Sequence, residues 1–234
     1  MEEVLDIYER DYDPQTPVIC FDERPSQLIG DVVIPLSMKP GHVLCQDYHY
    51  KRNGTCCVMM AIEPKVGKRI VEVKERKTKK DYALFMKKVA QHYRKAKKII
   101  VIQDNLNTHY PSSFYETFSP NRAFDLSQRF QMVYTPKKAS WLNMAEIELS
   151  ALSKQCLDRR IGDIKTFSKE VYAWAKKRNH QKTTISWQFT KNDARDKLGR
   201  HYQSIRNKIY KVVVCSIGRL RKAMVFVSHQ SVFS

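Results

Sequence analysis

Three carboxylates in this sequence stand where they could share metal ions. Asp22 follows the apolar run PVICF, Asp104 ends the apolar run KKIIVIQD, and Glu146 lies in the helical pattern WLNMAEIELSALSKQCL. Close carboxylates repel one another, so such a group persists only if a proton or a cation compensates it. Hard oxygen ligands with few histidines favour Mg²⁺ or Mn²⁺. Two such ions about 4 Å apart can activate a water and stabilise a leaving oxygen, which is the two-metal route to cutting phosphodiesters.

Each carboxylate also has a purely structural interpretation. An aspartate after a strand, such as Asp22, often caps a turn. Asp104 begins DNLNTH, where Asx turns could form, and Glu146 stands three residues after Asn143, the spacing of an N-terminal capping box. The signal therefore lies in the combination of the three residues. The reserve carboxylates are Glu23, Asp47 and Glu148.

The first half of the chain reads as strands. PVICF at 17–21 predicts a strand that stops at Asp22, and DERPSQLIGD predicts loop and irregular chain. Two β-rich segments then flank Lys51 to Gly54, and the Asn-Gly pair there predicts a hairpin turn. Gly67 leads into RIVEV, a third strand. We expect three consecutive antiparallel strands.

The second half alternates helices and strands. Apolar residues recur at helical spacing from Lys79 to Tyr93, and the run at 97–104 is typical of a strand buried on both faces. A helical or irregular segment at about 112–128, a strand in FQMVYTP and a helix in WLNMAEIELSALSKQCL follow. The order βββαβαβα predicts an α/β fold, the ribonuclease H-like mixed sheet with helices on both faces. A last amphipathic helix at about 165–176 should bury Phe167, Val171, Trp174 and Ala175.

The charge balance points to a polyanionic partner. The 234 residues hold 42 Lys and Arg against 24 Asp and Glu, a net charge of +18. Residues 1–17 contain six acidic residues and one basic residue, so the remainder carries 41 basic and 18 acidic residues, a net charge of +23. Such a charge attracts nucleic acid without regard to sequence. A solvated basic surface with no specific ligand is the alternative.

Other composition features bound the class of protein. No run of 18 apolar residues could span a bilayer, and the acidic start MEEVLDIYERDYD is unlike a signal peptide. The six cysteines form no C-x-x-C pair and mostly lie in apolar runs, which argues against a disulfide framework or a structural zinc. We expect a cytoplasmic protein, associated with the nucleoid when bound to DNA, and no membrane partner.

Four segments carry a family resemblance: CFDE, QDYHYKRNGT, VIQDNLNTH and TPKKASWLNMAEIELS. Over roughly residues 1–202 the chain resembles the catalytic domain of mariner-superfamily DDE transposases, in their bacterial insertion-sequence branch. The resemblance implies a ribonuclease H-like fold, a triad at Asp22, Asp104 and Glu146, two Mg²⁺ or Mn²⁺ ions, and cutting and joining of double-stranded DNA at TA targets. His109 matches the D-N-x-x-x-H motif, where it could position a phosphate or the second carboxylate, or simply hydrogen-bond a loop.

The resemblance also separates Glu146 from Glu148. Two residues apart on a helix, they point about 200° away from each other, so they cannot both reach one metal site. Helix geometry by itself leaves the choice open. The motif and the first-turn position favour Glu146, and Glu148 is then expected to be a solvated or salt-bridged residue on the flank, whose replacement by alanine should leave activity largely intact.

The sequence departs from the family in three places. Ser140 and Met144 stand in the usual proline positions, and 41 residues separate Asp104 from Glu146, more than is usual, with the insertion expected at 116–130. The third departure is the end of the chain, which resembles nothing in the family. We expect an acidic segment at 1–17, a DDE catalytic domain at 18–202 and a basic tail at 203–234 that folding does not require.

Several functions are compatible with these features. The leading hypothesis is a transposase catalytic domain that acts as a homo-oligomer in a synaptic complex. Family members carry a helix-turn-helix before this domain, so here end recognition is expected to be missing or separately encoded. The alternatives are a catalytically inert transposase remnant that only binds DNA, and a ribonuclease H-like repair or recombination nuclease, which would lack the WLNMAE motif.

Overall fold

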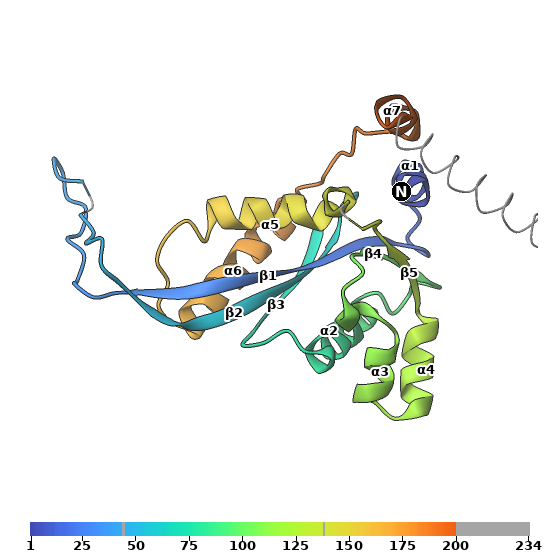
Figure 1. Cartoon of the computed structure of the whole chain (residues 1–234), viewed down its shortest axis with the longest axis horizontal. Helices are drawn as coiled ribbons and strands as arrows, with labels where there is room; N and C mark the ends of the chain where they lie inside the picture. Colours follow the sequence, from blue (N-terminus) through green and yellow to red (C-terminus); the bar gives the residue numbers. More distant parts are fainter. Residues whose placement is uncertain (44, 138, 200–234) are drawn as a thin grey trace, which may run out of the picture. The chain divides into compact units, whose positions relative to one another are not determined.

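A mixed five-stranded sheet forms the centre of the part of the chain that the computed structural model describes, residues 1–43, 45–137 and 139–199. The strand order is β3-β2-β1-β4-β5 (Figure 1). β1 (Val18–Asp31), β2 (Tyr50–Glu63) and β3 (Lys68–Lys74) are antiparallel neighbours. β4 (Ile99–Gln103) runs parallel to β1, and β5 (Phe130–Tyr134) runs parallel to β4. The predicted mixed sheet is confirmed.

Helices cover both faces of the sheet (Figure 1). One face carries α2 (Lys79–His92), α3 (Ser112–Thr117) and α4 (Pro120–Gln128), and the other carries α5 (Met144–Gln155) and α6 (Ile164–His180). There are two short 3₁₀ helices. η1 (Asn107–His109) follows β4, and η2 (Ser140–Leu142) precedes α5. None of the helices in the described ranges is long and apolar enough to cross a membrane.

The chain divides into two compact units. The first consists of Met1 and Glu3–Trp187, and the second, within the described residues, of Glu2 and Gln188–Gly199. Within the second unit, α7 (Lys191–Lys197) begins at Thr190, whose side chain forms a capping box with Asp193. The predicted tail at 203–234 lies outside the described residues, so its expected dispensability stays a prediction.

Local patterns account for the helices that were predicted. Thr78 accepts a hydrogen bond from the Asp81 amide, and the Asp81 carboxylate bonds back to the Thr78 amide, so α2 starts with a full capping box. The buried side of α2 is the predicted apolar stripe. α6 likewise buries the predicted set, Phe167, Val171, Trp174 and Ala175. α1 (Glu2–Glu9) was not predicted, and it buries Val4, Leu5, Ile7 and Tyr8.

Two apolar cores lie on opposite sides of the sheet. Alternate residues of a strand face opposite sides, so Ile19 and Phe21 of β1 join the core under α2, α3 and α4. Leu28 of β1 joins the core under α5 and α6, together with Met60 of β2 and Leu149 of α5. In β1, odd-numbered residues thus face α2 and even-numbered residues face α5.

The sequence prediction for the first hairpin was wrong. β1 does not stop at Asp22 but continues to Asp31, and it pairs with β2 along that whole length. The Asn-Gly pair lies within β2: Leu28 is opposite Gly54 and Ile29 is opposite Arg52, which leaves Asn53 as the extra residue of a bulge. Gly54 has a φ of +117°, which glycine adopts without strain. The connection between the strands is the segment 32–49, most of which is exposed.

Candidate active site

The two aspartates lie at the same level on neighbouring parallel strands. Cys20 of β1 is in register with Ile102 of β4, so Asp22 and Asp104 each stand two residues beyond that pair. β4 ends at Gln103, and the edge of β1 that faced it is therefore free at Asp22. Neighbouring strands run about 4.8 Å apart. Asp22 is therefore accessible because β4 ends beside it, although its own strand, β1, continues to Asp31.

Burial and neighbouring carboxylates act together on Asp22. Its Oδ1 accepts a 2.8 Å hydrogen bond from the Glu23 amide, which favours the charged form. Burial has the opposite and larger effect, and the charges of Glu146 and Asp104 add to it, so the pKa of Asp22 rises to about 7. These influences place all three predicted carboxylates in one electrostatic neighbourhood, and a bound cation would relieve the strain on Asp22.

Asn143 joins α5 to the strand that carries Asp22. Its side-chain oxygen accepts from the Ala145 amide as the N-cap of α5, while its Nδ2 donates to the Phe21 carbonyl at 2.8 Å. Glu146 follows in the first turn and is exposed. The Asn143 amide donates to the Ser140 carbonyl, so the capping-box alternative, in which Glu146 would accept that proton, does not describe this helix.

Glu148 occupies a different environment from Glu146. It is fully buried, with Oε1 2.5 Å from Nε of Arg69 and 2.6 Å from Nε of Arg178. Arg69 also donates to the carbonyls of Gly67 and Thr183. Of the two expected states of Glu148, solvated or salt-bridged, the structure has the salt-bridged one, and two arginines from β3 and α6 enclose the carboxylate.

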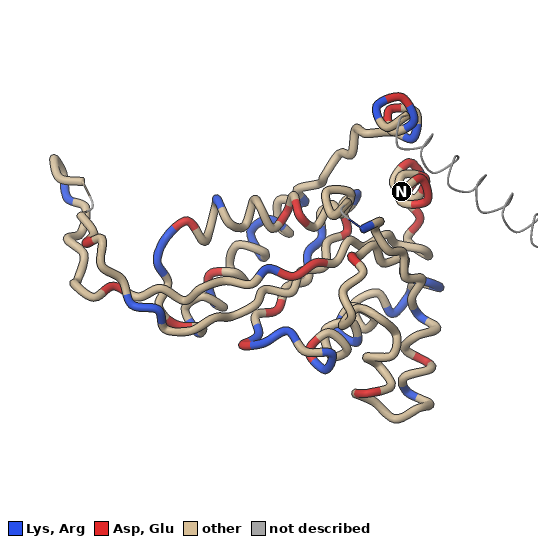
Figure 2. Tube along the Cα trace, viewed as in Figure 1, with Lys and Arg blue, Asp and Glu red and all other residues tan. Residues whose placement is uncertain are grey.

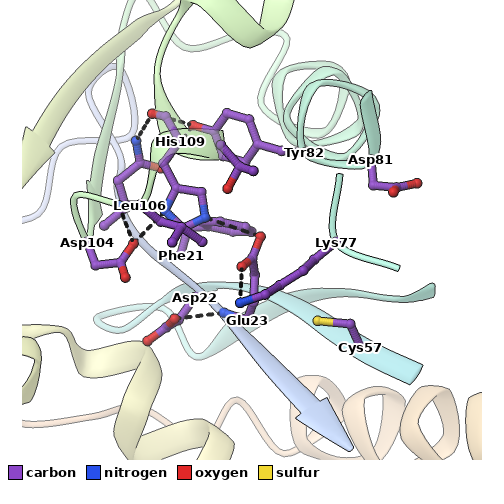
Figure 3. Close-up of polar contacts among 12 residues, drawn as sticks. Phe21, Asp22, Glu23, Cys57, Lys77, Asp81, Tyr82, Asp104, Leu106 and His109 are labelled. Atoms are coloured by element: carbon purple, nitrogen blue, oxygen red, sulfur yellow. Dashed lines mark hydrogen bonds and ion pairs between the residues drawn. The ribbon is translucent and has the colours of Figure 1, made fainter. Parts of the chain in front are cut away.

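His109 connects Asp104 to Glu23. Its Nδ1 lies 2.6 Å from Asp104 Oδ1, and its Nε2 lies 3.2 Å from Glu23 Oε1 (Figure 3). Burial by itself would lower the pKa of His109, but the two carboxylates outweigh it and raise the pKa to about 9. The His109 contact in turn lowers the pKa of Asp104. Of the functions considered for His109, the geometry favours positioning of the second carboxylate.

The side chain of Glu23 lies on the opposite face of β1 from the side chain of Asp22, because alternate residues of a strand face opposite sides. Figure 3 shows its side chain turned toward His109 and Lys77, whose Nζ lies 3.8 Å from Glu23 Oε2. No local sequence signal marked Lys77, which lies in the connection before α2. The other reserve carboxylate, Asp47, lies in the segment 32–49 and contacts His49.

The donor types around Asp22 fit a divalent cation. Carboxylate oxygens are the ligands that Mg²⁺ and Mn²⁺ prefer, and the raised pKa of Asp22 reflects burial and repulsion that a cation would offset. Within the described residues, no three Asp, Glu, His or Cys side chains are already gathered as a complete metal cage. Asp104 is turned toward His109, so a shared ion requires the carboxylates to turn toward it.

The mixed sheet thus carries Asp22 and Asp104 at the level where β4 ends, with Glu146 in the first turn of α5. A family model described as DDE superfamily endonuclease matches residues 17–168. Because the match covers more than half of the chain, this chain belongs to the DDE endonuclease superfamily. No curated protein sequence matches it significantly.

Solved structures with a similar fold include complexes of the Mos1 transposase. The Mos1 strand transfer complex has a TM-score of 0.50 and 14% identity, with 78% of this chain and 56% of that chain covered. The Mos1 paired-end complex with left transposon end has a TM-score of 0.49 and 13% identity at the same coverage. This chain therefore spans little more than half the length of those proteins, and the likeness concerns the fold. The predicted ribonuclease H-like fold and DDE family are confirmed.

Proposed function

We propose that this chain is the catalytic domain of a transposase that cuts DNA at insertion-sequence ends and joins the freed end to target DNA. The observation that carries the proposal is the shared level of Asp22 and Asp104 beside Glu146, where burial and then the two neighbouring carboxylates raise the pKa of Asp22. Membership of the DDE superfamily supports the reaction class. The Mos1 structures are complexes with transposon ends and of strand transfer, and one contains Mn.

The chain's own residues have distinct parts in this proposal. Asp22, Asp104 and Glu146 would hold two ions, Mg²⁺ or Mn²⁺. These ions would supply a nucleophile at neutral pH and stabilise the leaving oxygen. His109 fixes the orientation of Asp104 from behind through the ion pair at 2.6 Å. Asn143 fixes the start of α5 against β1, which sets the distance from Glu146 to Asp22.

Double-stranded DNA is the proposed substrate. Figure 2 shows lysines and arginines along the connection from β3 to α2, and Lys77 of this connection reaches Glu23 beside the carboxylates. Positive side chains next to an acidic centre would hold the DNA backbone while metal ions neutralise the carboxylates. We further propose that the working form is a homo-oligomer, because two DNA ends must be brought together, and that a helix-turn-helix domain recognises these ends.

A plasmid-nicking assay tests the proposal. The wild-type chain with Mn²⁺ should nick a plasmid carrying the candidate terminal repeats, and Asp22→Asn, Asp104→Asn and Glu146→Gln should each abolish nicking while DNA binding persists. Glu116→Gln, which removes an exposed carboxylate paired with Lys79, is the matched control and should nick normally.

Two outcomes would contradict the proposal. A folded wild-type chain that binds DNA but never nicks it would be an inert DNA-binding remnant. If the Glu146→Gln variant still nicks DNA, Glu146 does not take part in the proposed metal site. Glu148→Ala, which the sequence suggested as a harmless control, is unsuitable because the structure buries Glu148 between two arginines.

A further inference from the structure

A cavity of about 450 Å³ opens directly beside Glu146. Its walls come from two elements, β1 and α5. The lining residues are Glu23, Arg24, Pro25, Glu146, Leu149, Ser150, Ser153 and Lys154. The cavity therefore begins at the proposed active site and continues along the helix away from it.

The α5 wall presents one face of the helix. Ser150, Ser153 and Lys154 stand four, seven and eight residues after Glu146, and positions with that spacing share a face. Ser150 and Lys154 are exposed, and Ser153 donates its hydroxyl hydrogen to the Leu149 carbonyl. Beyond the carboxylate of Glu146, this wall offers the Ser150 hydroxyl and the positive charge of Lys154, since the Ser153 hydrogen is already donated within the helix.

The β1 wall presents Arg24. Arg24 has the same parity as Asp22, so its side chain leaves the strand on the α5 side, about 7 Å farther along. Its Nε is buried and has no hydrogen-bond partner among the described residues, and the Ser26 hydroxyl, two residues on, is in the same condition. A buried donor without an acceptor costs free energy, so an acceptor brought by a ligand would be strongly favoured here.

We propose that Arg24, Ser150 and Lys154 form a phosphate subsite that holds the DNA strand next to the phosphate at the three carboxylates. A guanidinium, an ammonium and hydroxyl donors are the groups that proteins use to bind phosphate oxygens. The cavity is continuous with Glu146, so a strand whose cleaved phosphate lies at the metal site would pass its neighbouring phosphate into this groove. This inference rests on the proposed function, since it takes the substrate strand as the ligand.

The salt dependence of DNA binding measures the contact between Arg24 and a DNA phosphate without requiring catalysis. The probe is a fluorescent 30-base-pair duplex, titrated with the full chain in Ca²⁺ at several salt concentrations. Each phosphate contact contributes about 0.9 to the slope of log affinity against log salt, so Arg24→Gln should lower the slope by about 0.9. Affinity at low salt should fall about tenfold. Arg24→Lys keeps the charge and should retain most of the slope.

Arg122→Gln is the matched control. It removes one positive charge from α4 on the other face of the sheet, where Arg122 lies over the Phe118 ring, and it should leave the slope nearly unchanged. Equal slopes for Arg24→Gln and Arg122→Gln would overturn the subsite. A chain that shows the Arg24 effect but never nicks DNA would contradict only the proposed function.

Chemical protection gives a second readout that does not depend on the stability of an Arg24 variant. With Cys45, Cys156 and Cys215 replaced by serine, Ser150→Cys and Ser119→Cys each add one exposed thiol, on α5 and at the start of α4 respectively. Bound duplex should slow alkylation at position 150 at least severalfold more than at position 119. Equal alkylation rates with and without DNA at position 150 would overturn the subsite.

Discussion

Replacing Asp22 by asparagine should stabilise the metal-free protein at pH 8. The side chain is nearly the same size, and it keeps an oxygen that can accept from the Glu23 amide as Asp22 does. What it removes is a negative charge held in a partly buried position near Glu146 and Asp104. The charge is useful only when a cation is bound, so without metal its removal should increase the free energy of unfolding.

The pH dependence follows from the direction of the pKa shift. Below pH 3.8 the Asp22 carboxyl is protonated in both folded and unfolded chains and contributes nothing. Between pH 3.8 and about 7 the unfolded chain ionises while the folded chain stays protonated, so stability falls as pH rises. Above pH 7 both forms are ionised and the loss is complete. The benefit of Asp22→Asn should therefore grow from pH 4 to pH 7 and then stay constant.

The magnitude follows from the same shift. A rise from 3.8 to about 7 corresponds to about 4 kcal/mol at 1.36 kcal/mol per pH unit, an upper limit because water and side chains rearrange around the charge. For a domain of this size, that limit corresponds to an increase on the order of 10 °C in the melting temperature. Urea unfolding in EDTA at pH 4.5 and pH 8 measures the difference between wild type and variant.

Two controls complete the experiment. Asp125→Asn changes an exposed aspartate on α4 and should shift stability by no more than about 0.5 kcal/mol at either pH. Added Mg²⁺ should stabilise the wild type and have little effect on Asp22→Asn. An Asp22→Asn variant that is less stable than the wild type at pH 8 in EDTA would refute the reasoning, because it would show that the charge is already compensated within the protein.

Three further changes test other parts of the structure. Glu148→Gln should lower the free energy of unfolding by about 3–5 kcal/mol in urea titrations, since it leaves two arginines without their buried partner, and an unchanged midpoint would count against this role. The raised pKa of His109 implies stability of about 3 kcal/mol that is complete below pH 6.5 and lost as pH rises through about 9, so His109→Gln should be clearly destabilised at pH 6 and much less at pH 10. DNA binding should weaken steeply between 50 and 200 mM salt and be similar for inverted-repeat and scrambled duplexes; a preference of about 10³ for the repeats would disprove sequence-independent binding.

The sequence by itself determined the elements whose signals are local. The continuous apolar run at 99–102 is typical of a strand buried on both faces, and it forms one in the structure. The apolar stripes of α2 and α6 predicted the buried sides of both helices, because a period of 3.6 residues is read from neighbouring residues. The end of that apolar run also predicted that Asp104 stands immediately after the strand, as it does after β4.

Only the tertiary structure decided features that depend on partners far along the chain. β1 continues past Asp22 because β2 pairs with it, and Asn53 and Gly54 form a bulge because the partner strand is already in place. The Asn-Gly pattern, taken alone, is equally compatible with a turn. Likewise, the first helix at Glu2–Glu9 depends on apolar contacts that its short, acidic sequence does not reveal.

Contacts with residues far along the chain also decided the different environments of the carboxylates. Helix geometry left Glu146 and Glu148 equivalent, and the structure separates them because arginines 79 residues before and 30 residues after Glu148 enclose it. Glu23 became the partner of His109 because the alternation along β1 points it to the opposite face from Asp22. Charge, burial and pKa are properties of the assembled neighbourhood, so residue types and spacing could nominate these carboxylates but could not assign their surroundings.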